Sequence, residues 1–257
     1  SSERFELLKR AYLDRDAPFA IFDKQFPAVG SCLLWTHNKE IALPLLIESG
    51  NPHELDEEKG LLLNASEVVV DLTALLLLHE MDALSLLSSL FDRVVIYRPV
   101  FQRLLGEVCF EGDDYAKAIV DYCRRDSSFE WGRRTTLANF RDNELQVLPE
   151  YCLGTVRQSE QQDLVLLAGD RNLRGWVAFR GGRTCGTRAL LEVALQDGLI
   201  AGDRLDAIII GLIERNARFV SCGPSTVLQK TVMCGSPGEL KNFADNLRAT
   251  MLTKGAN

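Results

Sequence analysis

The sequence lacks an excess of positive charge, although it carries 29 lysines and arginines. Its 36 aspartates and glutamates leave a formal net charge of −7. No global positive field therefore draws the protein to nucleic acid or to an anionic membrane. Any contact with nucleic acid has to come from a local basic patch.

The sequence also lacks paired cysteines and clustered histidines. Its seven cysteines contain no C-x-x-C pair, and its three histidines are isolated from one another. An odd set without such spacing disfavours a disulfide framework, a structural zinc site and a thiol enzyme. We therefore predict a cytoplasmic protein in a reducing compartment.

Long apolar runs are missing as well. The most apolar stretch, residues 72–78, is bounded by Asp71 and by His79 and Glu80, and it is far shorter than the roughly 20 residues that span a bilayer. This predicts no membrane partner. The chain does have 46% hydrophobic and 25% charged residues, a balance that is typical of a folded domain with a substantial core.

Apolar runs of strand length alternate with helical patterns through the middle of the chain. Nearly continuous apolar strands are typical of a parallel sheet that is covered on both faces. We therefore predict an α/β fold, a three-layer sandwich with a mostly parallel central sheet. The predicted strands are residues 68–72, 94–97, 145–148, 164–168, 183–185 and 218–221. The predicted helices are residues 74–90, 100–108, 113–125, 170–179, 188–196 and 203–216, one that begins at residue 225, and residues 237–251.

Helical segments flank this region on both sides. The sequence predicts a helical N-terminal segment over residues 1–60, an α/β domain over residues 61–225 and a C-terminal helical extension over residues 226–257. Residues 126–162 are irregular apart from the short strand prediction. No internal repeat or low-complexity tract interrupts this order.

Two aspartates stand at the carboxyl ends of predicted strands, where ligands bind in open parallel sheets. Asp71 follows three valines, and Asp170 follows an apolar run that ends at Gly169. If the two strands are neighbours, both carboxylates share one crevice, and a hard divalent cation such as Mg²⁺ or Mn²⁺ would relieve their repulsion. Alternatively, each aspartate simply caps the helix that follows it.

Two segments resemble the PIN domain family, and particularly bacterial PIN domains in longer chains with helical or tetratricopeptide neighbours. The first is SEVVVDLTALLLLHEM (residues 66–81), which resembles the first strand and helix of that domain. The second is LLAGDRNLR (residues 166–174) with GTRALL (residues 186–191) and DGLI (residues 197–200), which resembles its far end. The resemblance covers roughly residues 60 to 225, so we expect the α/β domain over residues 61–225 to be PIN-like.

The resemblance implies a PIN-like fold, related to flap nucleases, in which active members cut RNA with Mg²⁺ or Mn²⁺ held by three or four acids. Asp71 matches the first acidic position, and Asp170 matches the second residue of a frequent Asp-Asp pair. Gly169 replaces the first residue of that pair. After Pro99, Gln or Arg stands where the family usually has Glu.

Glu107 lies one helical turn beyond Arg103, so it could replace the missing acid. Arg103 itself could bind a phosphate, and Arg171 and Arg174 stand beside Asp170, where they could receive phosphates from nucleic acid. Pairing with nearby acids is the alternative for these arginines. A second basic stretch, Arg124, Arg125, Arg133 and Arg134 with Phe129 and Trp131 between them, is either a single-strand contact surface or a solvated loop.

Three hypotheses follow. The first is a ribonuclease that uses Mg²⁺ or Mn²⁺, with Asp71, Asp170 and Glu107 as catalytic metal ligands and Arg103, Arg171 and Arg174 on the RNA. The second is a catalytically inactive PIN-like module that binds nucleic acid or a protein, such as a helical or tetratricopeptide region. The third is an unrelated doubly wound domain used for assembly.

Overall fold

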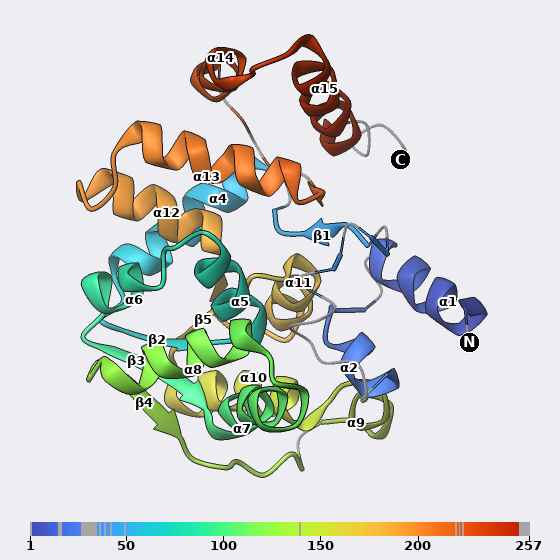
Figure 1. Cartoon of the computed structure of the whole chain (residues 1–257). Coiled ribbons are helices and arrows are strands. Elements are labelled where there is room, and N and C mark those ends of the chain that lie inside the picture. The colour runs from blue at the N-terminus through green and yellow to red at the C-terminus, as the bar shows by residue number, and fades with distance from the viewer. Residues whose placement is uncertain are drawn as a thin grey trace.

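The structure is a computed structural model, and it describes residues 2–14, 17–26, 35, 37–38, 40–41, 43–48, 50–138, 140–218, 220, 222 and 224–251. Its centre is a five-stranded, fully parallel sheet in the order β4-β3-β2-β5-β6 (Figure 1). This confirms the predicted α/β sandwich. The strands are β2 (Glu67–Val70), β3 (Arg93–Tyr97), β4 (Phe129–Gly132), β5 (Val165–Leu167) and β6 (Thr184–Cys185).

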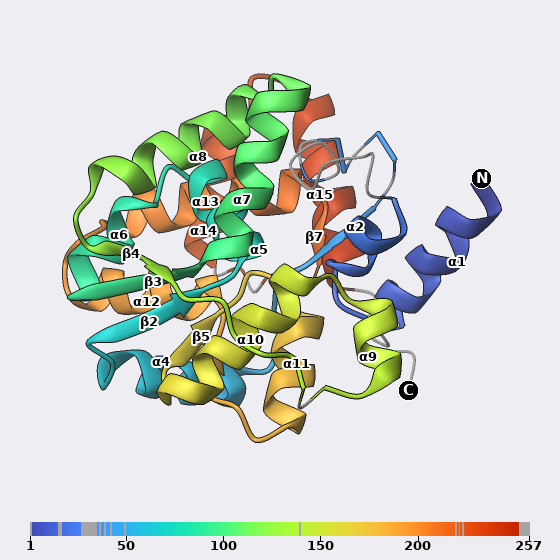
Figure 2. The ribbon, with the colours of Figure 1, turned by 90° about the horizontal axis from the view of Figure 1, so that it is seen from below.

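Helices cover both faces of this sheet because the buried residues 68–70 and 94–96 of its central strands are all apolar. Val68 and Val70 pack into the larger core, whereas Val69, between them, packs into the smaller one, as expected from side chains that alternate along a strand. The larger core includes α4 (Pro52–Leu63), α5 (Leu72–Glu80), α6 (Ser85–Leu90), α7 (Arg98–Gly106), α8 (Asp114–Arg125), α12 (Thr187–Gln196) and α13 (Gly202–Glu214). The smaller core includes α10 (Glu150–Gln162) and α11 (Arg171–Phe179), which lie with α9 (Asp142–Val147) in the lower half of Figure 2.

The N-terminal segment packs into the same core as the sheet. It contains α1 (Ser2–Leu13), α2 (Ile21–Gln25) and β1 (Leu45–Leu46) before α4, and its buried Tyr12 and Phe22 belong to the larger core. Strand β1 pairs in parallel with β7 (Ala217–Arg218), far along the chain. Helices α14 (Pro224–Met233) and α15 (Pro237–Met251) follow and lie at the top of Figure 1.

The secondary structure differs from the sequence predictions at four places. The single helix predicted over residues 74–90 is two helices, α5 and α6, separated by a break where Asp82 adopts a φ of 51°. Residues 145–148, predicted as a strand, end the short helix α9 instead. Helix α7 continues into a π-helical turn, η1 (Glu107–Glu111), and β4 is a strand that the sequence analysis did not identify.

Neighbouring strands of the sheet end together at one edge. Val70 pairs with Leu167, so the segments that leave β2 and β5 emerge side by side. Each leads directly into a helix, α5 or α11. Among the described residues, no helix has both the length and the apolar character needed to cross a membrane.

The packing of α10 against β3 gives a stability prediction. A Cβ atom added at Gly154 would lie 2.0 Å from Cε1 of Tyr97, and Tyr97 is completely buried and cannot retreat. We expect Gly154→Ala to lower the free energy of unfolding by about 3 kcal/mol. Gly60→Ala is the matched control, because a Cβ in that helix meets nothing within 4 Å; it should raise stability by about 0.5–1 kcal/mol. Urea denaturation measures both, and equal effects would contradict the packing argument.

Candidate functional site

Asp71 directly follows β2 and caps α5. Its Oδ1 accepts hydrogen bonds from the Ala74 amide at 2.7 Å and from the Gly169 amide at 3.3 Å. Its Oδ2 accepts one from the Thr73 hydroxyl at 2.6 Å. The first turn of a helix has free amide groups that need acceptors. Both carboxylate oxygens of Asp71 are therefore engaged within the protein.

Asp170 has the same role at the start of α11. Its Oδ1 accepts from the Asn172 amide at 3.1 Å, and its Oδ2 accepts from the Phe19 amide at 2.7 Å. Phe19 comes from the N-terminal segment, 151 residues away in the sequence. Asp170 therefore caps its own helix and also holds the N-terminal segment against the sheet.

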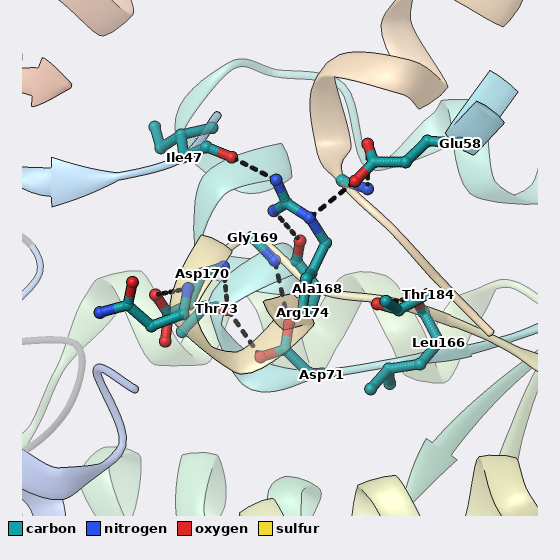
Figure 3. Close-up of polar contacts among 12 residues, drawn as sticks. Ile47, Glu58, Asp71, Thr73, Leu166, Ala168, Gly169, Asp170, Arg174 and Thr184 are labelled. Carbon is teal, nitrogen blue, oxygen red and sulfur yellow. Dashed lines mark hydrogen bonds and ion pairs between the residues drawn. The ribbon is translucent and has the colours of Figure 1, made fainter. Parts of the chain in front are cut away.

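Thr73 joins the two aspartates, as Figure 3 shows. Its Oγ1 accepts from the Asp170 amide at 3.0 Å and donates to Oδ2 of Asp71 at 2.6 Å. The predicted convergence of Asp71 and Asp170 at one edge of the sheet is thus observed. Their roles are those of the alternative interpretation, in which each caps a helix.

The space beside the two aspartates is closed. The cavity there has a volume of about 10 Å³, which is about the size of one water molecule. The N-terminal segment, α5, α10 and α11 contribute its walls, which are Ala20, Asp71, Leu72, Thr73, Tyr151, Cys152, Thr155, Asp170 and Leu173.

These residues do not fit a magnesium or manganese ion. Mg²⁺ needs six oxygens at about 2.1 Å and usually keeps several waters, whereas all four carboxylate oxygens of Asp71 and Asp170 already accept hydrogen bonds. Within the described part of the chain, no group of three or more histidine, cysteine, aspartate or glutamate side chains is placed to hold a metal ion.

Burial dominates the electrostatics of the aspartate pair. Burial raises the pKa of Asp170 to about 7, although hydrogen bonds from Phe19 and Asn172 act in the opposite direction. Burial also raises the pKa of Asp71, and the hydrogen bond from Thr73 is the largest opposing effect. Burial therefore disfavours the charged form of both carboxyl groups in the folded protein.

Gly169 is a glycine for a steric reason. A Cβ atom there would lie 2.6 Å from the carbonyl oxygen of Thr73 and 3.0 Å from the backbone nitrogen of Ala74. Both atoms belong to the backbone at the start of α5, so they cannot move aside without displacing that helix. The aspartate of the PIN pattern has no room at this position.

Glu107 lies in a different ionic network. It is fully buried in η1, and its Oε1 is 3.2 Å from Nε of Arg103. Arg103 also lies 3.4 Å from Oδ1 of Asp23 in α2, and Tyr151 donates a hydrogen bond to Oδ2 of Asp23 at 2.6 Å. Arg103 thus contacts acids, and it connects α7 to the N-terminal segment. Sequence analysis did not identify Asp23 or Tyr151, because nothing local marks their pairing.

Arg174 faces the interior and not solvent, which does not fit its predicted contact with nucleic acid. Its Nε lies 3.0 Å from Oε1 of Glu58, and its two terminal nitrogens donate to the carbonyls of Ala168 at 3.0 Å and Ile47 at 2.7 Å (Figure 3). Glu58, which sequence analysis also missed, accepts from the Gly186 amide at 3.0 Å as well. All the charged groups of this cluster therefore have partners.

Arg171 is the first residue of α11, and its side chain is half-buried. It lines a pocket of about 550 Å³ between α9 and α11, together with Trp176 and the exposed Phe179. The structure therefore separates the predicted site residues into a closed aspartate pair, a Glu107–Arg103 ion pair, the buried Arg174 and the half-buried Arg171.

The chain was compared with protein families, with curated proteins and with solved structures. No family model, no curated protein and no solved structure matches the chain.

The raised pKa of Asp170 predicts a pH-dependent stability. Burial disfavours the ionised form of Asp170 only in the folded state. The contribution of Asp170 to the unfolding free energy is therefore complete below the unfolded pKa of about 3.9, and it is lost as the pH rises to about 7. Asp170→Asn does not titrate. Between about pH 4 and pH 8, we expect the unfolding free energy of the wild type to fall relative to this variant by on the order of 4 kcal/mol. Urea denaturation at several pH values tests this, and a constant difference would contradict it.

The contacts of Gly169 give a second prediction. Gly169→Asp would supply the aspartate of the PIN pattern, but it should destabilise the fold by about 3 kcal/mol or more and should not create a metal site. Thermal unfolding with and without Mn²⁺ measures this. Gly175→Ala in α11 is the control, because its added Cβ meets nothing within 4 Å. Strong stabilisation of Gly169→Asp by Mn²⁺ would contradict the steric argument.

Proposed function

We propose that the chain is a catalytically silent PIN-like module that acts by binding and does not cleave RNA. One observation carries this proposal: the carboxylates of Asp71 and Asp170 are sealed and fully hydrogen-bonded within the protein. Metal-dependent hydrolysis needs a cation with an open position for water and for the substrate phosphate. A cavity of about 10 Å³ leaves no space for either.

The remaining acids support the same conclusion. Glu107, the candidate third ligand, pairs with Arg103, and the position before Asp170 admits only glycine. A two-metal mechanism requires several anionic ligands around ions about 4 Å apart. Asp71 and Asp170 are two carboxylates, and among the described residues no third acid joins them to complete such a set.

The experiment that tests this proposal combines metal binding with RNA cleavage. Mn²⁺ is titrated calorimetrically into the wild type, Asp71→Asn and Asp92→Asn at low salt and neutral pH, and each protein is incubated with RNA and Mg²⁺ or Mn²⁺. Asp92 is an exposed aspartate that reports non-specific binding. We expect the same weak binding in all three proteins and no cleavage that depends on Asp71. Stoichiometric binding and cleavage that are both lost in Asp71→Asn would refute the proposal.

A second candidate is a Mg²⁺- or Mn²⁺-dependent ribonuclease whose acids are covered. The observation in its favour is that part of the cover, Phe19 and Ala20, comes from the N-terminal segment. Asn172 holds this segment, because its side-chain amide donates to the carbonyls of Tyr12 at 2.7 Å and Ala17 at 2.8 Å. Asn172→Ala should loosen the cover. Mn²⁺-dependent RNA cleavage by this variant alone would favour the covered nuclease over the silent module.

A further inference from the structure

Two neighbouring strands deliver arginines to the same edge of the sheet. β3 and β4 are parallel, and their last paired residues are Tyr97 and Gly132. The next residue on each chain is an arginine, Arg98 or Arg133. The register of the sheet therefore places these two side chains at adjacent positions on its carboxyl edge, where ligands bind in open parallel sheets.

These arginines line a hollow that contains no acidic residue. Its volume is about 400 Å³, and its walls are Arg98, Gln102, Arg133 and Arg134. All four side chains are exposed. The hollow shares no lining residue with the closed aspartate cavity. Three positive charges thus gather in one place on a chain whose net charge is −7.

Among the residues that the structure describes, no carboxylate forms an ion pair with the arginines of this hollow. Other arginines of the domain, such as Arg93, Arg180 and Arg188, each lie within 4 Å of a carboxylate. In the described part of the chain, Arg98, Arg133 and Arg134 have no such partner. Helix α7 adds partial positive charge, since its N-cap residue, Tyr97, makes no side-chain capping bond. The hollow is therefore suited to an anion.

An aromatic pair lies next to these arginines in the sequence and on the same two elements. The rings of Phe101 in α7 and Trp131 in β4 have centroids 4.0 Å apart, and Trp131 is 38% exposed. A further arginine, Arg124, has its Cζ 5.2 Å from the centre of the Phe101 ring. Exposed rings beside cations are the combination that binds single strands, because bases stack on the rings while phosphates pair with the cations.

We propose that this hollow binds the phosphate groups of a single-stranded nucleic acid, with Trp131 as a stacking surface for a base. The guanidinium groups of Arg98, Arg133 and Arg134 can each donate paired hydrogen bonds to phosphate oxygens. The proposal rests on the proposed binding function and names its ligand. It places the ligand at the carboxyl ends of β3 and β4, away from Asp71 and Asp170, which follow β2 and β5.

The test measures fluorescence anisotropy of a labelled oligouridylate about ten nucleotides long, with the full chain at low salt and without divalent metal. We expect Arg98→Ala, Arg133→Ala and Arg134→Ala each to weaken binding about tenfold. Each should also reduce the slope of log K against log salt by about 0.7. Trp131→Leu should weaken binding by at least about fivefold without changing that slope.

The matched control is Arg10→Ala, which removes the same charge from an exposed position. It lies on α1, on the opposite side of the molecule from β4 in both views (Figures 1 and 2). The affinity of the Arg10→Ala variant for the oligouridylate should equal that of the wild type. Because all the substituted arginines are exposed, these variants should fold, and circular dichroism checks this.

Three results would overturn the proposal. They are an absence of oligouridylate binding by the wild type, an equal loss in Arg10→Ala, and equally strong competition by inorganic phosphate or by polyglutamate. The last result would assign the hollow to a free anion or to an acidic peptide. Any of them would leave the silent module intact, whereas Asp71-dependent cleavage with Mn²⁺ would refute the silent module whatever the hollow binds.

Discussion

The hydrogen bonds of two buried aspartates determine how the centre of this protein is built. β2 and β5 are neighbours, and each continues directly into a helix whose first amides need acceptors. Asp71 and Asp170 supply these acceptors, and the Thr73 hydroxyl connects them. Their burial raises the pKa of both. In an open crevice the same two residues would be suitable metal ligands, so the closure of the site decides between a structural and a catalytic role.

The closure depends on polar side chains that satisfy the backbone of the N-terminal segment. That segment crosses the carboxyl edge of the sheet, and buried carbonyls there need donors. Asn172 and Arg174, two residues apart in α11, donate to the carbonyls of Tyr12, Ala17 and Ile47. Helix α11 is therefore capped by Asp170, and its side chains also hold the N-terminal segment that covers the two aspartates.

Sequence patterns could predict the elements whose signal is local. The β-branched runs of β2 and β3 and the apolar run of β5 were identified, because a strand buried on both faces is apolar throughout. β4 was missed since its four residues, FEWG, combine an exposed acid with an exposed ring. Asp71 and Asp170 could be found from their places at strand ends. The partners of Arg103 and Arg174, Asp23 and Glu58, could not, because they lie 80 and 116 residues away in the sequence.

The pairing of β1 with β7 limits the order in which the contacts of the fold can form during synthesis. Leu45 pairs with Ala217, and Asn38 donates to the carbonyl of Arg215, so a strand synthesised early has its partner only after some 170 further residues have left the ribosome. Until then its apolar residues and unpaired edge are exposed to other chains. The pairing of β1 is therefore among the last contacts that can form as the chain is synthesised.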